Sequence, residues 1–584
     1  MNGYRQALHI ISALAVFIGV TCSSVSAEQS ADSLPQPLTL QDADTYRQIF
    51  ALQEKGQLNK AARLIKDIDN QILMGHVLAQ KYMHPTAYRS RYSELSDWLK
   101  LYYDHPIASR VKWLADKRRP KNAAYPKQPK KGYLNGVGHS VPQNFRASIP
   151  EHYNNRASPR KTASIAREVR RLIRRGYPSG ALEFLNKKET LRYLTASEEA
   201  HLRGEIAHAY FIFGVDDKAI RQARQAIGKN PKGAWLGHWA GGLAAWRSYR
   251  FELAEDFFTP LAENPEAPST LRSGAAFWAH RSALRRGAPK QASSYLSIAA
   301  QFKDNFYGVM ALQASGQLTR TEFRIPEIGP DFMGWLVSTR GGRRTLALLQ
   351  IGDWTRAERE LRYLYHEATD SHKLSMIGFA ARHHMPSLSY LLADIHKRRT
   401  GEYFNTALFP LLDPIVGYDV DEALVHAIIR KESSFYPLAR SRAKAIGLMQ
   451  ILPSTAAFIS GERKYRSSGR HLLHNPEVNL KLGQDYIRHL LNEPYIDGNL
   501  IKLLAAYNGG PGNLQKWKRR VDYHDDVFLL LESMPARETR NYVKAVTTYF
   551  YMYRLRLGLP TPELDELISG RAQDGRLAFL TSAE

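Results

Sequence analysis

The stretch LVHAIIRKESSF, residues 424–435, holds the carboxylate with the clearest capacity for chemistry. At helical spacing Val425, Ile428, Ile429 and Glu432 fall at i, i+3, i+4 and i+7, so the glutamate continues an apolar stripe. Unless such a carboxylate is protonated or hydrogen-bonded, facing an apolar interior costs it about 2–7 kcal/mol, and this raises its pKa. The stripe predicts a general acid that keeps its proton near neutral pH. By itself it is equally compatible with a buried glutamate that holds a helix end in place.

The C-terminal region carries further motifs with hydrogen-bonding or turn-forming residues. In GLMQ, Gly447 permits close backbone approach and Gln450 offers a neutral amide suited to sugar hydroxyl or acetamido groups. In AYNGGPG the chain cannot stay helical beyond the glycines and proline, so Tyr507 and Asn508 are predicted to be displayed at a helix end. The motifs begin at Ala445 (AIGLMQILPSTA), Asn475 (NPEVNLKLGQDYIRHLL), Leu504 (LAAYNGGPGNLQKW) and Met534 (MPARETRNYVKAV).

Together with ESSF at Glu432, these motifs resemble those of the soluble, periplasmic lytic murein transglycosylases, whose catalytic domain is similar to goose lysozyme. The resemblance covers the whole C-terminal domain. The N-terminal helical part resembles that family's superhelical, ring-forming region through weaker motifs. Ala536, Leu452, Arg442 and Lys444 depart from the family pattern, which affects the expected subsite preferences and leaves the chemistry as it is.

The resemblance implies roles for individual residues. Glu432 would be the catalytic residue, and the substrate-binding residues would be Ser441, Gln450, Tyr507, Asn508, Glu538 and Tyr542. Asn508 has an alternative role, which we favour, in bracing its helix end. Glu538 has the alternative of an ion pair with Arg537 or Arg540, and Tyr542 follows it by one helical turn.

The resemblance also implies a reaction. Glu432 would protonate the bond between N-acetylmuramic acid and N-acetylglucosamine and then, as a base, let the C6 hydroxyl close a 1,6-anhydro ring. No metal and no cofactor are expected, and the chain lacks a compact ligand set such as HExxH. Two rival hypotheses remain, a hydrolase built on the same domain and a scaffold that holds glycan without cleaving it. Nucleic-acid binding is disfavoured because no recognised module is present.

A repeat before residue 400 predicts stacked pairs of helices. A glycine precedes an alanine by five residues at Gly56, Gly176, Gly214, Gly287 and Gly352, and the stretch from Tyr249 keeps the alanine without the glycine. Ala181, Ala219, Ala254 and Ala292 are spaced by 38, 35 and 38 residues, the length of a helix-turn-helix unit. The expected fold is all-α, with an N-terminal superhelical, tetratricopeptide-like α-solenoid before a lysozyme-like, mainly α catalytic domain.

The predicted organisation begins with a signal peptide. Residues 1–27 have the charged, apolar and small-residue order of a secretory signal, and Cys22, the one cysteine, lies within it. Cleavage without a lipid is favoured over lipidation at that cysteine. Residues 117–161 are basic and rich in Pro and Gly, and a linker or an ordered surface loop fits them equally well. The expected segments are 1–27, 28–116, 117–161, the solenoid at 162–405, the catalytic domain at 406–565 and a tail at 566–584.

The net charge of +25 indicates an anionic partner. For an exported protein we expect this partner to be the glycan strands of peptidoglycan in the periplasm, with envelope proteins as further partners of the solenoid surface. No transmembrane anchor is expected after signal cleavage. The four tryptophans Trp235, Trp239, Trp246 and Trp278 are predicted to be core residues rather than a sugar-binding platform.

Overall fold

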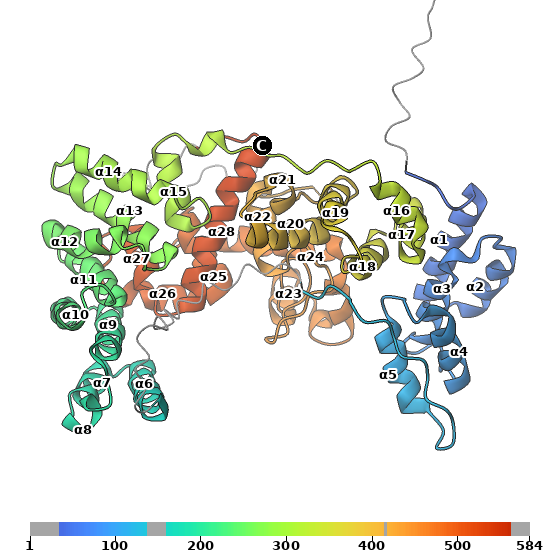
Figure 1. Ribbon diagram of the computed structural model, residues 1–584, viewed down its shortest axis with the longest axis horizontal. Coiled ribbons are helices and arrows are strands. Elements are labelled where there is room, and N and C mark those ends of the chain that lie inside the picture. The colour runs from blue at the N-terminus through green and yellow to red at the C-terminus, as the bar shows by residue number, and fades with distance from the viewer. Residues whose placement is uncertain (1–33, 137–158, 414–416, 562–584) are drawn as a thin grey trace, which may run out of the picture. The chain divides into compact units, whose positions relative to one another are not determined.

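The computed structural model describes residues 34–136, 159–413 and 417–561 of the chain (Figure 1). In these ranges the regular elements are helices, and β-type pairing is limited to isolated bridges of Ile446 with Arg440 and Ile451. The predicted all-α fold class is thus confirmed. The predicted signal peptide and C-terminal tail lie outside the described residues. Within them, none of the helices has the length and apolar character that crossing a membrane requires.

The chain divides into two compact units. The first combines residues 1–131 with 336–361, and the second combines 132–335 with 362–584. Each unit combines segments that are far apart in sequence, so no single boundary along the chain separates the two units. The predicted domain limits therefore stay predictions. The helices of the first unit are α1 (Leu40–Glu54), α2 (Leu58–Leu64), α3 (Met74–Tyr82), α4 (Tyr92–Tyr102), α5 (Ala108–Arg118), α17 (Arg340–Gln350) and most of α18 (Trp354–Leu364).

Buried charges join the two segments of the first unit. Arg344 of α17 donates to both carboxylate oxygens of Glu360 at 2.8 Å and to Asp104 at 3.1 Å. His76 of α3 lies 2.9 Å from the same Glu360, which is fully buried. Because removing one member of such a network strands the other charges in the interior, the network fixes how α3, α17 and α18 pack.

The second unit begins with a series of helices over residues 159–314, most of which pack against the next helix along the chain, as the green part of Figure 1 shows for the later ones. The four tryptophans predicted to be core residues are at most 6% exposed, which confirms that prediction. The series is followed by three helices that precede the catalytic motifs. The helices of the series are α6 (Pro159–Arg174), α7 (Pro178–Leu185), α8 (Lys188–Leu191), α9 (Ala196–Ile212), α10 (Asp216–Lys229), α11 (Trp235–Arg247), α12 (Phe251–Glu263), α13 (Ser269–Arg285), α14 (Pro289–Ala300) and α15 (Phe306–Ala314). Helix α16 (Phe332–Ser338) comes next along the chain and runs into the first unit. The three helices before the catalytic motifs are α19 (Asp370–Arg382), α20 (Pro386–Thr400) and α21 (Asn405–Leu408).

The repeat glycines have the backbone conformation that the sequence predicts. All five have a φ between 71° and 80°, the left-handed region that ends a helix. The paired alanines Ala181, Ala219, Ala254 and Ala292 are at most 1% exposed, so neighbouring helices approach closely there. Tyr249, which stands where a glycine is expected, keeps the same turn with a φ of 58°. The repeat geometry thus persists where its glycine is lost.

The last part of the second unit carries the catalytic motifs. Its longest helix, α28, packs against α22, α25 and α27, and also against α15 of the preceding series. Of the basic segment 117–161, residues 119–136 contain no regular helix, and Leu134 is held by a 3.0 Å backbone hydrogen bond to Arg362. The helices are α22 (Glu422–Glu432), α23 (Pro453–Ser460), α24 (Pro476–Leu491), α25 (Leu500–Gly509), α26 (Pro511–Arg520), α27 (Val527–Ser533) and α28 (Arg537–Arg556).

Candidate active site

Glu432 is the last residue of α22. The side chain of Asp421 caps the start of this helix by accepting from the Leu424 N–H at 3.0 Å. After Glu432 the chain turns sharply, because Ser434 and Phe435 both adopt the left-handed conformation, with φ values of 49° and 65°. Two consecutive non-glycine residues in this region are strained, and such strain gathers at functional sites. The turn leaves the Glu432 carboxyl projecting from the helix end, as the sequence predicts.

Helix α22 is more deeply buried than one apolar stripe requires. Every residue from Ala423 to Arg430 is buried, including His426, which lies off the stripe. The helix is therefore central to its domain, with protein on all sides. Glu432 itself, at the helix end, is partly exposed.

The surroundings of Glu432 favour its protonated form. Burial raises the pKa of this carboxyl to about 7, and Glu538 adds to the rise, while Tyr542 and Lys431 oppose it. No ion pair to Glu432 is found among the described residues. A carboxyl group with this pKa can both give and take a proton near neutral pH, which is what a general acid that later acts as a base needs.

Two tyrosines lie beside this carboxyl, and a third packs against one of them. The rings of Tyr507 and Tyr542 are stacked with centroids 6.4 Å apart and planes 9° apart, and Tyr486 lies 5.3 Å from Tyr507. The Tyr507 hydroxyl donates to the carbonyl of Met449 at 2.9 Å. The Tyr542 hydroxyl is buried beside Glu432 and reaches no hydrogen bond of normal geometry within the described residues. Burial, and then the nearby Glu432, raises the pKa of both Tyr507 and Tyr542, so both stay neutral.

The GLMQ turn is held by one buried amide. Asn479 of α24 accepts from the Met449 N–H at 2.8 Å and donates to the carbonyls of Ile446 and Leu473, both at 2.9 Å. Gly447 has a φ of 83°, and a Cβ there would lie 2.3 Å from the Asn479 amide nitrogen and from the Leu473 carbonyl. The close approach predicted at Gly447 is therefore observed, and its partner is the protein itself. The turn places the Met449 carbonyl against Tyr507.

The remaining side chains predicted to bind substrate form hydrogen bonds with nearby parts of the protein. The Gln450 amide folds back onto the Gly447 carbonyl at 2.8 Å, and the Ser441 hydroxyl accepts from the Ala445 N–H at 2.9 Å, so each supports its own turn. Asn508 accepts from the Thr539 hydroxyl at 2.9 Å and so braces α25 against α28.

Glu538 is exposed in the first turn of α28, whereas Tyr542 on the same helix is buried, because only the later residue reaches the domain interior. Neither of the ion pairs considered for Glu538 forms, as far as the described residues go. Arg540 instead donates to the carbonyl of Met534.

Two residues that contribute to the site were not selected from the sequence. Tyr486 and Asn479 both lie in NPEVNLKLGQDYIRHLL, a motif noted for its resemblance alone. A signal was present, since an asparagine seven residues before a tyrosine puts both on one helical face. Their partners, however, come from other helices, and spacing along one helix does not reveal those.

One group of side chains has the geometry of a metal site, in the first unit. The ligand atoms of His76, His105 and Glu360 lie within 4.8 Å of one another. Arg344 already occupies both oxygens of Glu360. Besides burial, the cations Arg356, Arg344 and Arg359 lower the pKa of His76, and the same positive field disfavours a bound cation.

Comparison with known families identifies the region around this centre. Residues 414–527 match the family described as Transglycosylase SLT domain. This part of the chain is a transglycosylase SLT domain. The SLT domain thus contains Glu432, the GLMQ turn, Asn479 and Tyr507, while Tyr542 follows it on α28.

Curated relatives match a stretch of similar length. Over 145 residues the chain is 36% identical to the soluble lytic murein transglycosylase of Salmonella typhimurium, covering 24% of this chain and 22% of that protein. The enzyme of the same name from Escherichia coli K12 is 36% identical over 148 residues, with the same coverage. The matched region thus spans about a fifth of the length of these curated relatives.

Solved structures show the same fold over most of the chain. An inactive mutant of the lytic transglycosylase Slt from Pseudomonas aeruginosa aligns with a TM-score of 0.55 at 20% identity, covering 89% of this chain and 87% of that one. The 70 kDa soluble lytic transglycosylase of Escherichia coli aligns with a TM-score of 0.55 at 16% identity, covering 92% and 99%. At such identities the likeness establishes the fold.

Proposed function

We propose that the protein is a peptidoglycan lytic transglycosylase that cleaves the β-1,4 bond between N-acetylmuramic acid and N-acetylglucosamine. The observation that carries the proposal is the carboxyl of Glu432, whose pKa burial raises to about 7 and which lies beside the neutral phenols of Tyr507 and Tyr542. The SLT domain and its relatives named as murein transglycosylases support this substrate. The net charge of +25 suits an anionic polymer.

The reaction uses one carboxyl group twice. Glu432 donates its proton to the glycosidic oxygen as the bond from that oxygen to C1 of the muramoyl residue breaks. The acetamido group of the same sugar stabilises the cation that develops at C1, as in substrate-assisted glycosidases. The Glu432 carboxylate then takes the proton of the C6 hydroxyl, whose oxygen bonds to C1. The 1,6-anhydro ring closes and Glu432 is again protonated.

The surrounding residues have supporting roles in this proposal. Tyr542 faces the Glu432 carboxyl and opposes the rise of its pKa, which keeps the group able to act as a base. Tyr507 is fixed by the Met449 carbonyl and presents its ring beside the reacting sugar. Ser441, Gln450, Asn508 and Glu538 are proposed to line the substrate path, Asn508 mainly by bracing α25.

The product mass tests the proposal. Purified protein is incubated with murein sacculi, and the soluble products are analysed by mass spectrometry for the wild type and for Glu432→Gln. We expect muropeptides lighter by one water than hydrolysis products from the wild type, and a loss of release in the variant. Products carrying the added water would establish a hydrolase instead, and clearance of murein by the variant would remove Glu432 from the mechanism.

We further propose that the protein acts in the periplasm after export and that other envelope proteins bind the helical series. The relatives named as soluble murein transglycosylases and the apolar run of residues 7–20 support this location.

A further inference from the structure

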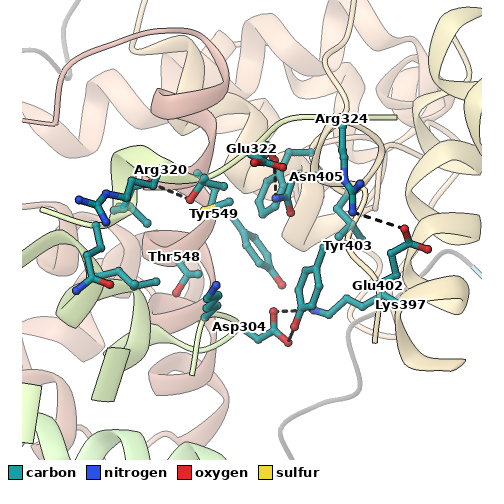
Figure 2. Close-up of a pocket in the computed structure, with 18 of the residues that line it drawn as sticks. Asp304, Arg320, Glu322, Arg324, Lys397, Glu402, Tyr403, Asn405, Thr548 and Tyr549 are labelled. Atoms are coloured by element: carbon teal, nitrogen blue, oxygen red, sulfur yellow. Dashed lines mark hydrogen bonds and ion pairs between the residues drawn. The ribbon is translucent and has the colours of Figure 1, made fainter. Parts of the chain in front are cut away.

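A pocket of about 900 Å³ in the second unit is lined by side chains of both charge signs. Asp304 pairs there with Lys397 at 2.9 Å (Figure 2). Arg324 pairs in the same way with Glu402, at 3.5 Å. Because these charges balance one another, the pocket does not select a ligand by charge. The first unit, in contrast, has a surface on which positive charge is not balanced.

This surface follows the end of α5, where the chain continues without regular helix (Figure 1). Residues 117–131, KRRPKNAAYPKQPKK, contain seven basic side chains and no acidic one, and we call them the basic segment. All five of its lysines are exposed. The basic side chains are those of Lys117, Arg118, Arg119, Lys121, Lys127, Lys130 and Lys131.

Hydrogen bonds hold the basic segment against α4. The hydroxyl of Tyr92, the first residue of α4, donates to the carbonyl of Ala124. The backbone N–H of Lys130 donates to the carbonyl of Tyr103, just after the end of the same helix, at 2.8 Å. The middle and the end of the basic segment are therefore fixed, and its lysines are presented from a defined backbone.

The acidic residues that precede the basic segment do not neutralise it. Each acidic side chain between residues 89 and 116 has a partner outside the basic segment. The pairs are Glu94 with the Arg91 N–H, Asp97 with Lys100, Asp104 with Arg344, and Asp116 with Lys112. The positive charge of the basic segment therefore remains available to an anionic partner.

Two exposed aromatic side chains lie among these cations. Trp113 of α5 is 56% exposed, and Tyr125 of the basic segment is 73% exposed. The Lys117 ammonium lies 4.0 Å from the ring centre of Trp113, and the Arg119 guanidinium lies 3.9 Å from that of Tyr125. Exposed tryptophan and tyrosine beside lysine and arginine are typical of surfaces that rest on the headgroup layer of a membrane.

The same geometry distinguishes among anionic partners. A nucleobase binds an aromatic side chain by stacking on an open ring face. Here one face of each ring is already covered by a cation of the protein itself. A headgroup layer needs no open face, because it surrounds the ring while its phosphates approach the neighbouring cations. The cations are also spread over the whole basic segment, which suits a plane of negative charges better than a single anion.

We propose that the basic segment, together with Trp113, docks the protein on the surface of a bilayer that contains anionic phospholipid. The lysine ammonium groups contact lipid phosphates, and the rings of Trp113 and Tyr125 lie at the level of the headgroups. The docking is independent of the proposed reaction, since Glu432 belongs to the second unit. At the proposed periplasmic location, it keeps the protein beside a membrane while it acts on murein.

Vesicle cosedimentation of the full chain tests the docking. One set of vesicles consists of phosphatidylcholine, and the other is an equal mixture of phosphatidylcholine and phosphatidylglycerol. We expect the wild type to bind the mixed vesicles at least about tenfold more tightly than the neutral ones, because several cations contribute. High salt should remove this preference, since it screens exposed charges.

A pair of double variants locates the binding. Lys121→Gln with Lys127→Gln should weaken binding to the mixed vesicles by roughly 25-fold, because each lysine near an anionic bilayer contributes about fivefold. The matched control is Lys55→Gln with Lys60→Gln, which removes the same charge from exposed lysines of the first unit outside the basic segment. The control should bind like the wild type.

Fluorescence tests the contact made by the tryptophan. Brominated phosphatidylglycerol in the mixed vesicles should quench part of the tryptophan emission of the wild type. Trp113→Phe should lose this quenching while it still sediments with the vesicles, because the cations remain. Since the lipid comparison and the quenching are both measured on the wild type, the test stands even if a variant does not fold.

Several outcomes would overturn the inference. These are equal binding to both kinds of vesicle, an equal loss in the two double variants, and quenching that persists in Trp113→Phe. If the Lys121 and Lys127 variant bound vesicles like the wild type but no longer bound murein sacculi, the partner would be the polymer instead. Vesicle binding by a wild type that releases no muropeptides would refute the proposed reaction and leave the docking surface standing.

Discussion

Helix α28 places side chains from two different faces beside two glutamates, Glu432 and Glu532. Glu532 of α27 is 2% exposed, accepts from the Tyr307 hydroxyl and pairs with Lys544 at 2.6 Å. Glu432 meets Tyr542 from the same helix, two residues earlier, and has no cation paired with it among the described groups. The same residue type therefore has a structural role where the helix supplies an ammonium group, and is available for proton transfer where it supplies a neutral phenol.

The most direct test of the comparison replaces the carboxyl group of Glu432, which has no ion-pair partner among the described residues. In Glu432→Gln we expect murein turnover to fall by about 10²–10⁴-fold, the usual contribution of a general acid. Stability should not fall, because no ion pair is lost. Chromatography of released muropeptides measures the first effect and urea unfolding the second. Glu538→Gln makes the same atomic change on an exposed side chain of α28, and an equal loss there would mean that both carboxylates do the chemistry.

Removing Lys544, the cation of α28 that pairs with Glu532, should lower the free energy of unfolding instead. Lys544→Met removes the ion-pair partner of the buried Glu532, and breaking a buried pair in this way typically costs about 3–5 kcal/mol of the free energy of unfolding. Urea unfolding measures it. Adding Glu532→Gln should restore part of the loss, because the stranded charge disappears. A single variant as stable as the wild type would contradict the structural role assigned to this pair.

The stability difference between wild type and Glu432→Gln should depend on pH. Burial raises the folded pKa of Glu432 from 4.5 to about 7, so above pH 4.5 the unfolded chain loses this proton while the folded chain retains it. The wild type should therefore lose stability relative to the variant between pH 4.5 and 7, by about 3 kcal/mol in total, and show no further relative change above that range. Urea unfolding of both proteins at pH 4.5, 6 and 8 measures this. If the stability difference between the two proteins were the same at all three pH values, the Glu432 carboxyl would have to be in contact with solvent.

The smallest expected effect comes from the phenol itself. Tyr542→Phe removes the hydroxyl that lowers the pKa of Glu432, so the high-pH limb of the activity profile should move upward by less than about one pH unit. Stability should change little, since the hydroxyl has no hydrogen bond of normal geometry in the described structure. The pH dependence of muropeptide release measures the shift. Tyr551→Phe removes the hydroxyl of another buried tyrosine of α28, and it should leave the profile in place.

The sequence predicts the features of this protein that depend on neighbours along one helix. The left-handed repeat glycines, the buried alanines and the end of α22 at Glu432 follow from local spacing and turn chemistry. The depth of α22 does not, because His426 and Arg430 are buried by helices that are distant in the chain. Residues of one motif also separate in space, as exposed Glu538 and buried Tyr542 do.

Contacts between motifs were similarly beyond prediction. The sequence indicates that Gly447 lies near another group, but the group is the side chain of Asn479, which comes from the next helix but one. Gln450 has the amide expected of a sugar-binding residue, and in the structure that amide bonds within its own turn. Such choices among partners are made by tertiary packing, which periodicity does not encode.

Asn479 restricts how the loop beside Glu432 can be redesigned. Its one amide supplies an acceptor for one backbone group and donors for two others, a combination that no shorter or acidic side chain offers. Aspartate would set a negative charge against two carbonyl oxygens, and glutamine would need room for an additional methylene in a site that is fully buried. A library that varies residues 446–452 to alter substrate preference should therefore hold this asparagine and its glycine constant.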